Sequence, residues 1–200
     1  MPYYAVRVGR KPGVYVSWEA CKAQTHGFKG AVYKKFESKA EAEAFIGDEA
    51  QMPEVHPDVQ DLPAGVCVAY VDGSFNAKTK QYGYGVVFFS SRGKEDFYGS
   101  GSGEGARHRN VAGEILGAEV AMDVALERGA QKLTIVHDYA GIRHWAMGEW
   151  KANLPMTQAY RAKAETVRHQ LDLRFQKVAA HTGVEWNEEA DRLAKRGAGI

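Results

Sequence analysis

Val66-Cys67-Val68-Ala69-Tyr70-Val71-Asp72-Gly73-Ser74 is an apolar run that closes on an acid, a glycine and a serine. A short apolar run bounded by turn residues predicts a buried strand, and Gly73 predicts a turn directly after Asp72. The end of such a strand can aim the Asp72 carboxylate at the edge of a sheet. An aspartate in this position most often forms a turn, so Asp72 needs acidic partners before it indicates a functional site.

Three more acids stand where an element can aim them at the same point. Asp138 follows a short apolar strand that ends at Val136, and adjacent strands would bring Asp138 to about 5 Å from Asp72. Glu114 lies in the first turn of a predicted helix, and Asp191 lies in the first or second turn of the last helix. Acids at helix starts commonly interact only with the macrodipole, so each acid taken singly keeps a structural interpretation. Their joint placement favours a metal site.

The elements around these acids predict an α/β fold in which helices pack on a mixed sheet. Three strands come first and suggest an antiparallel meander, after which helices and strands alternate. The predicted strands cover residues 66–72, 82–90, 96–100, 133–136 and 173–180, and the predicted helices cover residues 111–128, 139–147, 156–172 and 187–196. On the long helix, Glu119, Asp123 and Glu127 share one i, i+4 row, which predicts a solvated acidic face.

The first 47 residues predict a separate, small α+β domain. Its strands are expected at residues 3–8, 13–16 and 31–36 and its helices at residues 18–24 and 39–46. It carries eight Lys/Arg against four Asp/Glu. Residues 48–63 contain three prolines, five acids and no base, which predicts an extended linker, and residues 64–200 form the second domain. Two tethered domains can engage neighbouring positions on one ligand.

The composition is that of a soluble globular protein, with 44% hydrophobic residues and a net charge of +1. The sequence has no long apolar run, and its first residues resemble neither a secretory signal nor a transit peptide, so we expect a cytoplasmic protein without a membrane partner. Cys21 and Cys67 lack metal-ligand spacing and are expected to be unpaired thiols. Neither a heptad repeat nor an exposed apolar stripe indicates assembly, so a monomer is the default expectation.

Four converging carboxylates suit a pair of divalent ions about 3.5 to 4 Å apart, which activate water on one side of a phosphodiester and stabilise the leaving oxygen on the other. Oxygen ligands favour Mg²⁺, with Mn²⁺ as a substitute. Without metal the carboxylates repel one another, so their pKa values should rise and metal should stabilise the fold. His181 can shuttle protons near neutral pH, and a loop histidine bonded to the backbone is an equal alternative.

The second domain resembles ribonuclease H of type 1 over roughly residues 66–197. The matching motifs are, in order, Asp72-Gly73-Ser74, Asn110-x-x-x-Glu114, Asp138 after its strand, and His181-x-Gly183-x-x-x-Asn187-x-x-x-Asp191. The resemblance implies a ribonuclease H-like mixed five-stranded sheet and an endonuclease that cuts the RNA strand of RNA/DNA hybrids, leaving 5′-phosphate and 3′-hydroxyl ends. It also implies that the four acids bind two metal ions and that His181 is the mobile proton carrier. Asn110 would contact nucleic acid near the cut, and Asn187 would support the active-site loop.

The first domain is similar to the hybrid-binding, or viroplasmin-like, domain that often precedes such nucleases. The similarity rests on Tyr4-Ala5-Val6-Arg7-x-Gly9-Arg10-x-x-Gly13, Trp18 and Tyr33-Lys34-Lys35-Phe36. It implies that Tyr4, Trp18 and Tyr33 pack on DNA sugars while Lys34 and Lys35 hold phosphates, and it leaves double-stranded RNA open as a second ligand. Aromatic faces interleaved with a basic cluster suit backbone contacts without base readout. The alternative is that Tyr4 and Phe36 are core residues, which we favour for Phe36.

The sequence departs from the family pattern at three places. Residues 75–81 replace the common Gly-Asn-Pro-Gly turn, His137 and Tyr139 flank Asp138 where Thr and Ser are usual, and Gly113 precedes Glu114 in place of a larger residue. None of these changes removes a ligand, but they leave substrate geometry and metal preference near Asp138 open.

Two tryptophans receive different interpretations. Trp150 is expected near the DNA strand, because related enzymes have a DNA groove or basic protrusion in this region. Trp145 is interpreted as a core residue at helical spacing with Ile142.

Two rival functions are considered. One is a non-catalytic protein that binds RNA/DNA hybrids or double-stranded RNA, and the presence of all four acids and His181 argues against it. The other is a DNA-cutting nuclease of the same fold, such as a resolvase or an integrase, and the hybrid-binding domain argues against that.

Overall fold

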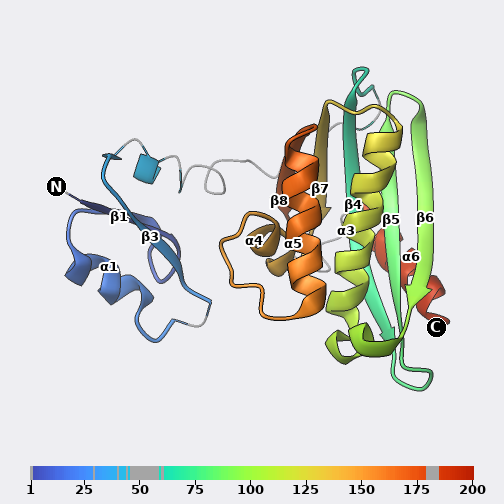
Figure 1. Cartoon of the computed structure of the whole chain (residues 1–200), viewed down its shortest axis with the longest axis horizontal. Helices are drawn as coiled ribbons and strands as arrows, with labels where there is room; N and C mark the ends of the chain where they lie inside the picture. Colours follow the sequence, from blue (N-terminus) through green and yellow to red (C-terminus); the bar gives the residue numbers. More distant parts are fainter. Residues whose placement is uncertain are drawn as a thin grey trace. The chain divides into compact units, whose positions relative to one another are not determined.

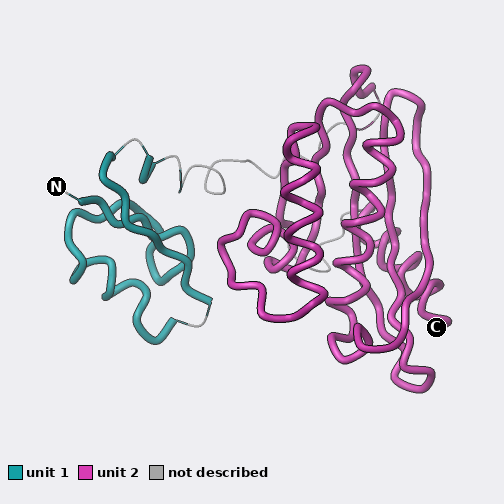
Figure 2. Tube along the Cα trace, in the orientation of Figure 1, with its two compact units in different colours: residues 1–55 teal, residues 56–200 magenta. Residues whose placement is uncertain are grey.

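The structure, a computed structural model, describes residues 2–28, 30–39, 41–43, 45, 59, 61–178 and 185–200. The chain divides into two compact units, residues 1–55 and residues 56–200 (Figure 2). Most of the linker expected at residues 48–63 lies outside the described residues. At its end, Val59 and Leu62 pack against a hydrophobic cluster of the second unit.

The first unit is built on a three-stranded antiparallel sheet in the order β2-β1-β3. Its strands are β1 (Tyr3–Val8), β2 (Gly13–Tyr15) and β3 (Val32–Phe36). The helix α1 (Trp18–Thr25) begins after Ser17, whose hydroxyl accepts a hydrogen bond from the Ala20 N–H at 3.2 Å. Serine is a favoured N-cap because its oxygen accepts a hydrogen bond from such an N–H group. The sheet and the helix together confirm the predicted α+β arrangement.

The second helix expected in this unit, over residues 39–46, falls partly outside the described residues. The residues of that span that are described are helical, and the Ser38 hydroxyl accepts a hydrogen bond from the Glu41 N–H at 3.2 Å. The buried Arg7 of β1 donates to the Phe45 carbonyl at 2.6 Å and lies 4.0 Å from the centre of the Phe45 ring. Arg7 therefore ties this helical segment to the central strand.

The second unit contains a mixed five-stranded sheet in the order β6-β5-β4-β7-β8, as the α/β prediction requires. The first three strands along the chain form an antiparallel meander, and β7 pairs in parallel with β4 and β8. The strands are β4 (Val66–Asn76), β5 (Gln81–Ser90), β6 (Gly93–Gly101), β7 (Lys132–His137) and β8 (Asp172–Lys177). The helices are the 3-10 helix η1 (Gly103–His108), α3 (Asn110–Glu127), α4 (Gly141–Ala146), α5 (Pro155–Arg168) and α6 (Glu185–Ala198).

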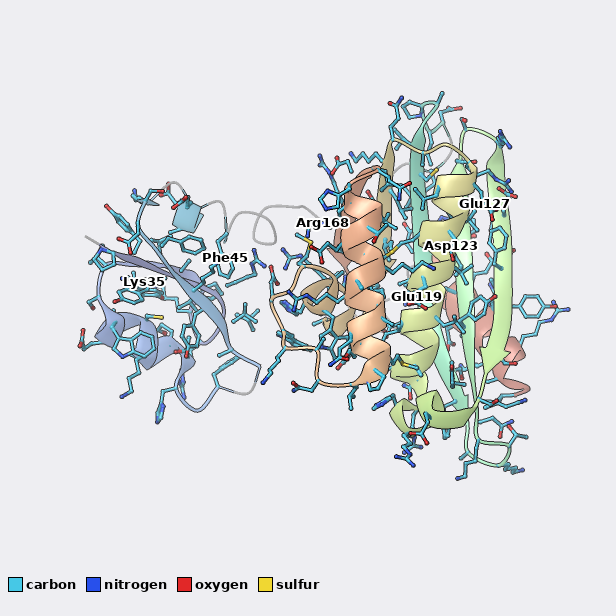
Figure 3. All side chains as sticks on the ribbon, viewed as in Figure 1. Lys35, Phe45, Glu119, Asp123, Glu127 and Arg168 are labelled. Atoms are coloured by element: carbon cyan, nitrogen blue, oxygen red, sulfur yellow. The ribbon has the colours of Figure 1, made fainter. Side chains whose placement is uncertain are left out.

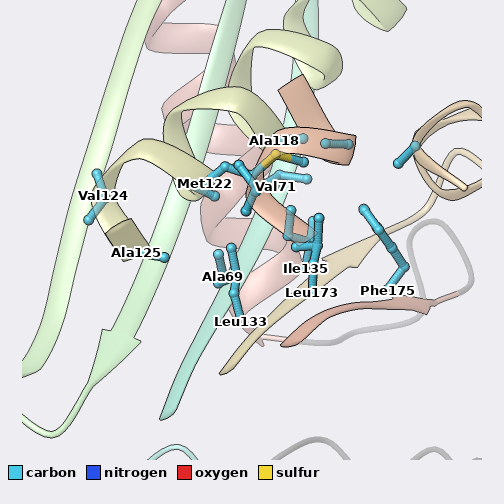
Figure 4. Packing of buried hydrophobic residues seen from close by; sticks show 14 of the residues in the cluster. Ala69, Val71, Ala118, Met122, Val124, Ala125, Leu133, Ile135, Leu173 and Phe175 are labelled. Atoms are coloured by element: carbon cyan, nitrogen blue, oxygen red, sulfur yellow. The ribbon is translucent and has the colours of Figure 1, made fainter. Parts of the chain in front are cut away.

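Helices cover both faces of this sheet (Figure 1). On one face, Val71 packs in the same cluster as Met122 of α3 (Figure 4). Tyr160 of α5 belongs to this cluster as well. On the other face, Tyr70 clusters with Ala190 of α6. Successive residues of a strand point to opposite faces, and both faces are buried here. This explains why β4 begins as a continuous apolar run rather than an alternating one.

Asp72 does not end its strand, so the predicted turn at Gly73 is wrong. β4 continues to Asn76, Asp72 pairs with Gly85 within the β4–β5 ladder, and the turn lies at residues 77–80. A Cβ atom on Gly73 would lie 2.0 Å from the carbonyl oxygen of Asn110 in α3. Glycine at this position therefore permits the close approach of a helix to an extended strand.

The acidic row of α3 is only partly a solvated face (Figure 3). Asp123 and Glu127 are exposed, and Asp123 accepts a hydrogen bond from Lys163 of α5 at 2.6 Å. Glu119 is half-buried, and burial raises its pKa. The prediction of a solvated face is confirmed for Asp123 and Glu127 and wrong for Glu119, which is half-buried on a helix that packs against α5.

Cys21 and Cys67 are both buried free thiols, which confirms the prediction that they are unpaired. Within the described ranges, no helix combines the length and the apolar character needed to span a membrane.

Candidate active site

The candidate acids lie just beyond the end of the hydrogen-bonded ladder between the central strands β4 and β7. This parallel ladder ends at the pair Tyr70–Val136, two residues before Asp72 and Asp138. Glu114 reaches this point from α3 on one face of the sheet, and Asp191 reaches it from α6 on the other. All four carboxylate residues line one cavity of about 320 Å³, whose lining is Asp72, Gly73, Asn110, Val111, Glu114, Asp138, Tyr139 and Asp191. The joint placement expected from the sequence is therefore present in the fold.

Three of the four carboxylates are held by donors of the protein itself. Asp72 Oδ1 accepts from the Gly73 N–H at 2.7 Å, and Glu114 Oε1 accepts from the Tyr139 N–H at 3.2 Å. Asp191 Oδ2 forms an ion pair with Lys195 Nζ at 2.6 Å, one helical turn further along α6. These contacts give each of these side chains a defined direction in the absence of any other ligand.

Burial and mutual repulsion make two of the acids weak. Burial first, and then the charge of Asp138, raise the pKa of Asp72 to about 7, against a smaller opposing effect of the Gly73 N–H. Burial also raises the pKa of Glu114 well above its ordinary value, and the charges of Asp138 and Asp72 add to that effect. The rise expected for converging carboxylates is confirmed for these two residues.

The donor set fits divalent cations with hard-ligand preferences. Four carboxylates around one cavity supply the oxygen ligands that Mg²⁺ and Mn²⁺ take, and a bound cation would offset the burial and repulsion that raise the pKa values of Asp72 and Glu114. Among the described residues, however, no three His, Cys, Asp or Glu side chains already converge as a preformed ion site would. Asp72, Glu114 and Asp191 line the cavity while each accepts a hydrogen bond from the protein itself.

Glycines bring the two helices within reach of the strands. A Cβ atom on Gly113 of α3 would lie 2.0 Å from the Gly83 carbonyl oxygen, and one on Gly85 would lie 2.0 Å from the Ala190 carbonyl oxygen of α6. Gly113 is one of the departures from the family pattern, and its position explains it. A larger residue would push α3, and with it Glu114, away from the sheet.

The two residues that flank Asp138 form a second departure. His137 is fully buried, and its Nδ1 lies 2.9 Å from the Tyr139 carbonyl oxygen. Burial lowers the pKa of His137 to about 3, and the nearby charges of Lys177 and Arg143 act in the same direction. The ring is therefore neutral at physiological pH.

An aromatic cluster stands behind Tyr139. The rings of Trp145 and Trp150 lie 5.8 and 6.5 Å from the Tyr139 ring, and Trp150 stacks on His144 at 4.6 Å. Glu149 Oε2 lies 2.6 Å from His144 Nδ1 and also accepts a bond from Arg143, so a buried polar group anchors the cluster. Trp145 is half-buried and packs against the core that contains Ile142, so the core interpretation holds only in part. Trp150 is half-buried beside a residue that lines the cavity, and its contact with DNA stays a prediction.

A second, cationic cavity lies next to the first. It has a volume of about 440 Å³ and is lined by Phe75, Ala77, Lys80, Ala106, Arg107 and Arg109. The Arg109 guanidinium lies 5.3 Å from the centre of the Phe75 ring, and Asn110, the next residue, lines the acidic cavity.

The hairpin turn that replaces Gly-Asn-Pro-Gly is fixed by the side chain of Asn76. Its oxygen accepts hydrogen bonds from the N–H groups of Lys78 and Thr79 at 3.0 and 3.3 Å. Its amide donates to the carbonyl oxygens of Ala198 and Gly199 in the C-terminal segment.

Several residues in or beside the two cavities were not predicted from the sequence. Lys195 stands four positions after Asp191 on a helix, which is the spacing of an ion pair and is readable from the sequence. Arg107 and Arg109 precede Asn110 in a short basic run, a signal that was also available. The Tyr139 N–H left no signal, because a backbone donor becomes visible only when the fold is known.

The predicted roles of two further site residues, His181 and Asn187, stay open. His181 lies outside the described residues, so its role as proton carrier stays a prediction. Asn187 is 6% exposed in the first turn of α6, and its Oδ1 has no hydrogen-bond partner among the described residues. Its support of the active-site loop likewise stays a prediction.

The aromatic residues predicted in the first unit form one row, in which Tyr4 is half-buried and Trp18 and Tyr33 are exposed. The ring of Trp18 lies 5.8 Å from Tyr4 and 5.7 Å from Tyr33, and Trp18 and Tyr33 are 40% and 45% exposed. Lys34 and Lys35 follow Tyr33 on β3 and are exposed. Phe36 is half-buried and packs on Phe45 at 5.2 Å, in line with the core interpretation.

The strand order β6-β5-β4-β7-β8 and the acid-lined cavity beyond the end of the β4–β7 ladder define a nuclease of the ribonuclease H class. Residues 65–199 match the family model described as RNase H, which covers more than half of the chain, and the chain belongs to that family. Residues 2–46 match the model described as Ribonuclease H1 N-terminal domain. The two resemblances expected from the motifs are confirmed.

Known proteins resemble the chain over one or both units. Ribonuclease H1 of Homo sapiens is 28% identical over an alignment that covers 98% of this chain and 89% of the human protein. Ribonuclease H of Saccharomyces cerevisiae is 51% identical over 45 residues, 22% of this chain and 13% of that protein. The crystal structure of RNase H1 from the archaeon Halobacterium salinarum has the same fold, with a TM-score of 0.56 and 21% identity over 68% of this chain and 98% of that one. LC11-RNase H1, whose structure is a complex with an RNA/DNA hybrid, has a TM-score of 0.54 and 17% identity over 66% of this chain and 96% of that one.

Proposed function

We propose that the chain hydrolyses the RNA strand of RNA/DNA hybrids with two divalent ions, Mg²⁺ or its substitute Mn²⁺, and leaves 5′-phosphate and 3′-hydroxyl ends. The observation that carries the proposal is the meeting of Asp72, Glu114, Asp138 and Asp191 in one cavity where the central strands separate. Membership of the RNase H family supports the same chemistry.

The protein's own groups have distinct tasks in this proposal. When bound, the ions supply an activated water and stabilise the leaving oxygen of the phosphodiester. The four carboxylates hold the ions, and Asn110 at the wall of the cavity contacts the nucleic acid. His181 carries the proton between the reacting oxygens and solvent, and Asn187 supports the loop that carries His181. Lys195 must release Asp191 when that carboxylate turns to a metal.

Binding of the hybrid is divided between the two units. In the first unit, the row of Tyr4, Trp18 and Tyr33 offers flat faces to deoxyribose, and Lys34 and Lys35 offer charge to phosphates. In the second unit, the cationic cavity beside the active site attracts the backbone that passes the acids. Such contacts bind nucleic acid without reading its sequence. RNA is distinguished from DNA by its 2′-hydroxyl groups, and the hybrid presents one strand of each kind.

The test is a comparison of three labelled duplexes: an RNA/DNA hybrid, an RNA duplex and a DNA duplex. Each is incubated with the full chain and Mg²⁺, Mn²⁺ or a chelator. We expect cleavage of the hybrid RNA alone, in both metals and not in the chelator. The new 5′ ends should accept label from a polynucleotide kinase only after phosphatase treatment, as 5′-phosphates do. Binding of the hybrid or the RNA duplex without cleavage in any metal would support the non-catalytic alternative. Cleavage of the DNA duplex would indicate a DNA nuclease of this fold.

A further inference from the structure

The backbone of Tyr139 joins three parts of the active site. Its N–H donates to Glu114 Oε1 at 3.2 Å, and its carbonyl oxygen lies 2.9 Å from His137 Nδ1. The same oxygen accepts from the Ile142 N–H at 3.1 Å, where α4 begins. The residue directly after Asp138 is therefore held on both sides of its Cα atom.

His137 is itself held rigidly. Its side chain is 0% exposed and meets the Phe175 ring edge-on at 6.1 Å, and its carbonyl accepts from the Val178 N–H at 2.9 Å. A carbonyl oxygen can only accept, so Nδ1 must carry the ring proton in the contact with Tyr139. Nε2 has no hydrogen-bond partner among the described residues. The ring therefore directs its proton to the turn that follows Asp138.

The Tyr139 side chain is fixed as well. Its ring packs on Trp145 and Trp150, and it covers Gly141 so closely that a Cβ atom there would lie 2.3 Å from the ring. With the ring, the N–H and the carbonyl all fixed, the backbone angles of Tyr139 have little freedom. Asp138 lies between the two held residues His137 and Tyr139, which limits the directions that its carboxylate can take.

We propose that His137 is a positioning residue of the reaction, which holds the Tyr139 carbonyl and thereby orients the Asp138 carboxylate toward the proposed metal site and the Tyr139 N–H toward Glu114. The inference rests on the proposed function, because the acids that His137 positions are the proposed metal ligands. The role requires no change in the protonation of His137. It also gives a physical reason for the histidine and tyrosine that replace the family's usual Thr and Ser around Asp138.

A purely structural role for His137 is the competing explanation, because the ring also fills space in the core. The two roles separate in a pair of variants of the full chain. His137→Leu keeps approximately the volume of the ring but lacks the donor. His137→Asn keeps an N–H donor at the position of Nδ1 but leaves a gap, which lowers stability.

Three measurements apply to both variants and to the unmodified chain. They are the thermal midpoint, the cleavage kinetics of a labelled hybrid as a function of Mg²⁺, and the shift of the thermal midpoint when Mn²⁺ is added without substrate. For His137→Leu we expect kcat to fall and the half-activating Mg²⁺ concentration to rise, each about 10-fold, which is the usual cost of losing a hydrogen bond behind a metal ligand. KM for the hybrid should stay within about twofold, because other surfaces bind it. His137→Asn should remain within about threefold of the unmodified chain in all kinetic terms, despite a lower thermal midpoint.

The outcomes separate the possibilities. The role is supported if His137→Asn, which keeps the hydrogen-bond donor, has a higher kcat and a larger Mn²⁺-induced shift of the thermal midpoint than His137→Leu, which lacks it. It is overturned if activity follows the thermal midpoints instead, or if His137→Leu keeps the unmodified kcat and Mg²⁺ dependence. Nitrogen-15 NMR of the imidazole adds a test without substrate, in which the Nδ1–H tautomer supports the contact and the Nε2–H tautomer contradicts it. Absence of metal-dependent cleavage by the unmodified chain would overturn the proposed function itself, and this role with it.

Discussion

The two units offer nucleic acid opposite kinds of surface. The first unit exposes its proposed binding groups: Trp18 of α1 and Tyr33 of β3 are among its most accessible large side chains. The second unit encloses its proposed catalytic groups, and Glu114 of α3 is 4% exposed. Exposed rings add binding energy at little cost to folding. Buried carboxylates destabilise the fold until a cation neutralises them, so the nuclease unit should be sensitive to packing, pH and metal in ways that the first unit is not.

The largest effect is expected where the helix α3 meets β4. Gly73→Ala places a Cβ atom 2.0 Å from the Asn110 carbonyl and 2.4 Å from the Glu114 nitrogen. We expect a loss of about 3 kcal/mol in the free energy of unfolding and a fall of about 100-fold or more in cleavage, because Glu114 is displaced. Denaturant unfolding and hybrid cleavage measure both.

A matched control lies in the same helix. A Cβ atom on Gly117 would meet nothing closer than 3.5 Å, so Gly117→Ala should be neutral or should stabilise the protein by up to about 1 kcal/mol. Equal losses in Gly73→Ala and Gly117→Ala would show that close helix approach does not build the site.

The next effect concerns pH and the metal-free protein. The folded-state pKa of Asp72 is about 7, above the ordinary 3.8, so the folded state binds the proton more tightly than the unfolded state does. Below pH 4 both states are protonated and no penalty exists. Between about pH 4 and 7 stability is progressively lost, and above pH 7 the full penalty applies.

Asp72→Asn removes this penalty. In a chelator at pH 8 we expect the variant to be more stable than the unmodified chain by roughly 2 to 4 kcal/mol, and at pH 4 the two should be equal. Denaturant unfolding at both pH values measures the difference. Added Mg²⁺ at pH 8 should narrow it, because only the unmodified chain gains a complete ligand set. An Asn variant that is less stable at pH 8 would contradict the account of the buried acids.

The smallest effect is expected in the first unit. Trp18→Ala should weaken hybrid binding about 10-fold in a chelator and leave kcat at saturating hybrid unchanged, because an aromatic face contributes on the order of 1 to 3 kcal/mol to nucleic-acid stacking. Fluorescence anisotropy with a labelled hybrid measures the affinity. Phe28→Ala is the matched control, since Phe28 is 38% exposed in the same unit but is not part of the aromatic row. Equal losses in both variants, or a lower kcat for Trp18→Ala, would contradict the division of labour.

The sequence predicted the helices and strands well, but it predicted the contacts between them less well. The apolar run of β4, the capped helix α1 and the acid after β7 follow from local patterns. The turn expected at Gly73 was wrong because glycine also marks close packing, and a local pattern does not show which helix arrives there. The Tyr139 N–H and the His137 ring were not predicted as parts of the site for the same reason. Their roles depend on contacts between segments that only the fold brings together.

If the four carboxylates form one catalytic metal site and other surfaces bind the hybrid, an acid of the site is needed for cleavage but not for binding. Asp138→Asn can be compared with Asp123→Asn, the same substitution on the exposed part of the acidic row of α3. Cleavage of the labelled hybrid in Mg²⁺ and its affinity in a chelator are measured for both variants. We expect Asp138→Asn to lose about 10³-fold or more in cleavage, on the order of 4 kcal/mol of transition-state stabilisation, and to bind within about threefold of the unmodified chain, whereas Asp123→Asn should change neither. Full cleavage by Asp138→Asn would rule out a catalytic metal site formed by the four carboxylates.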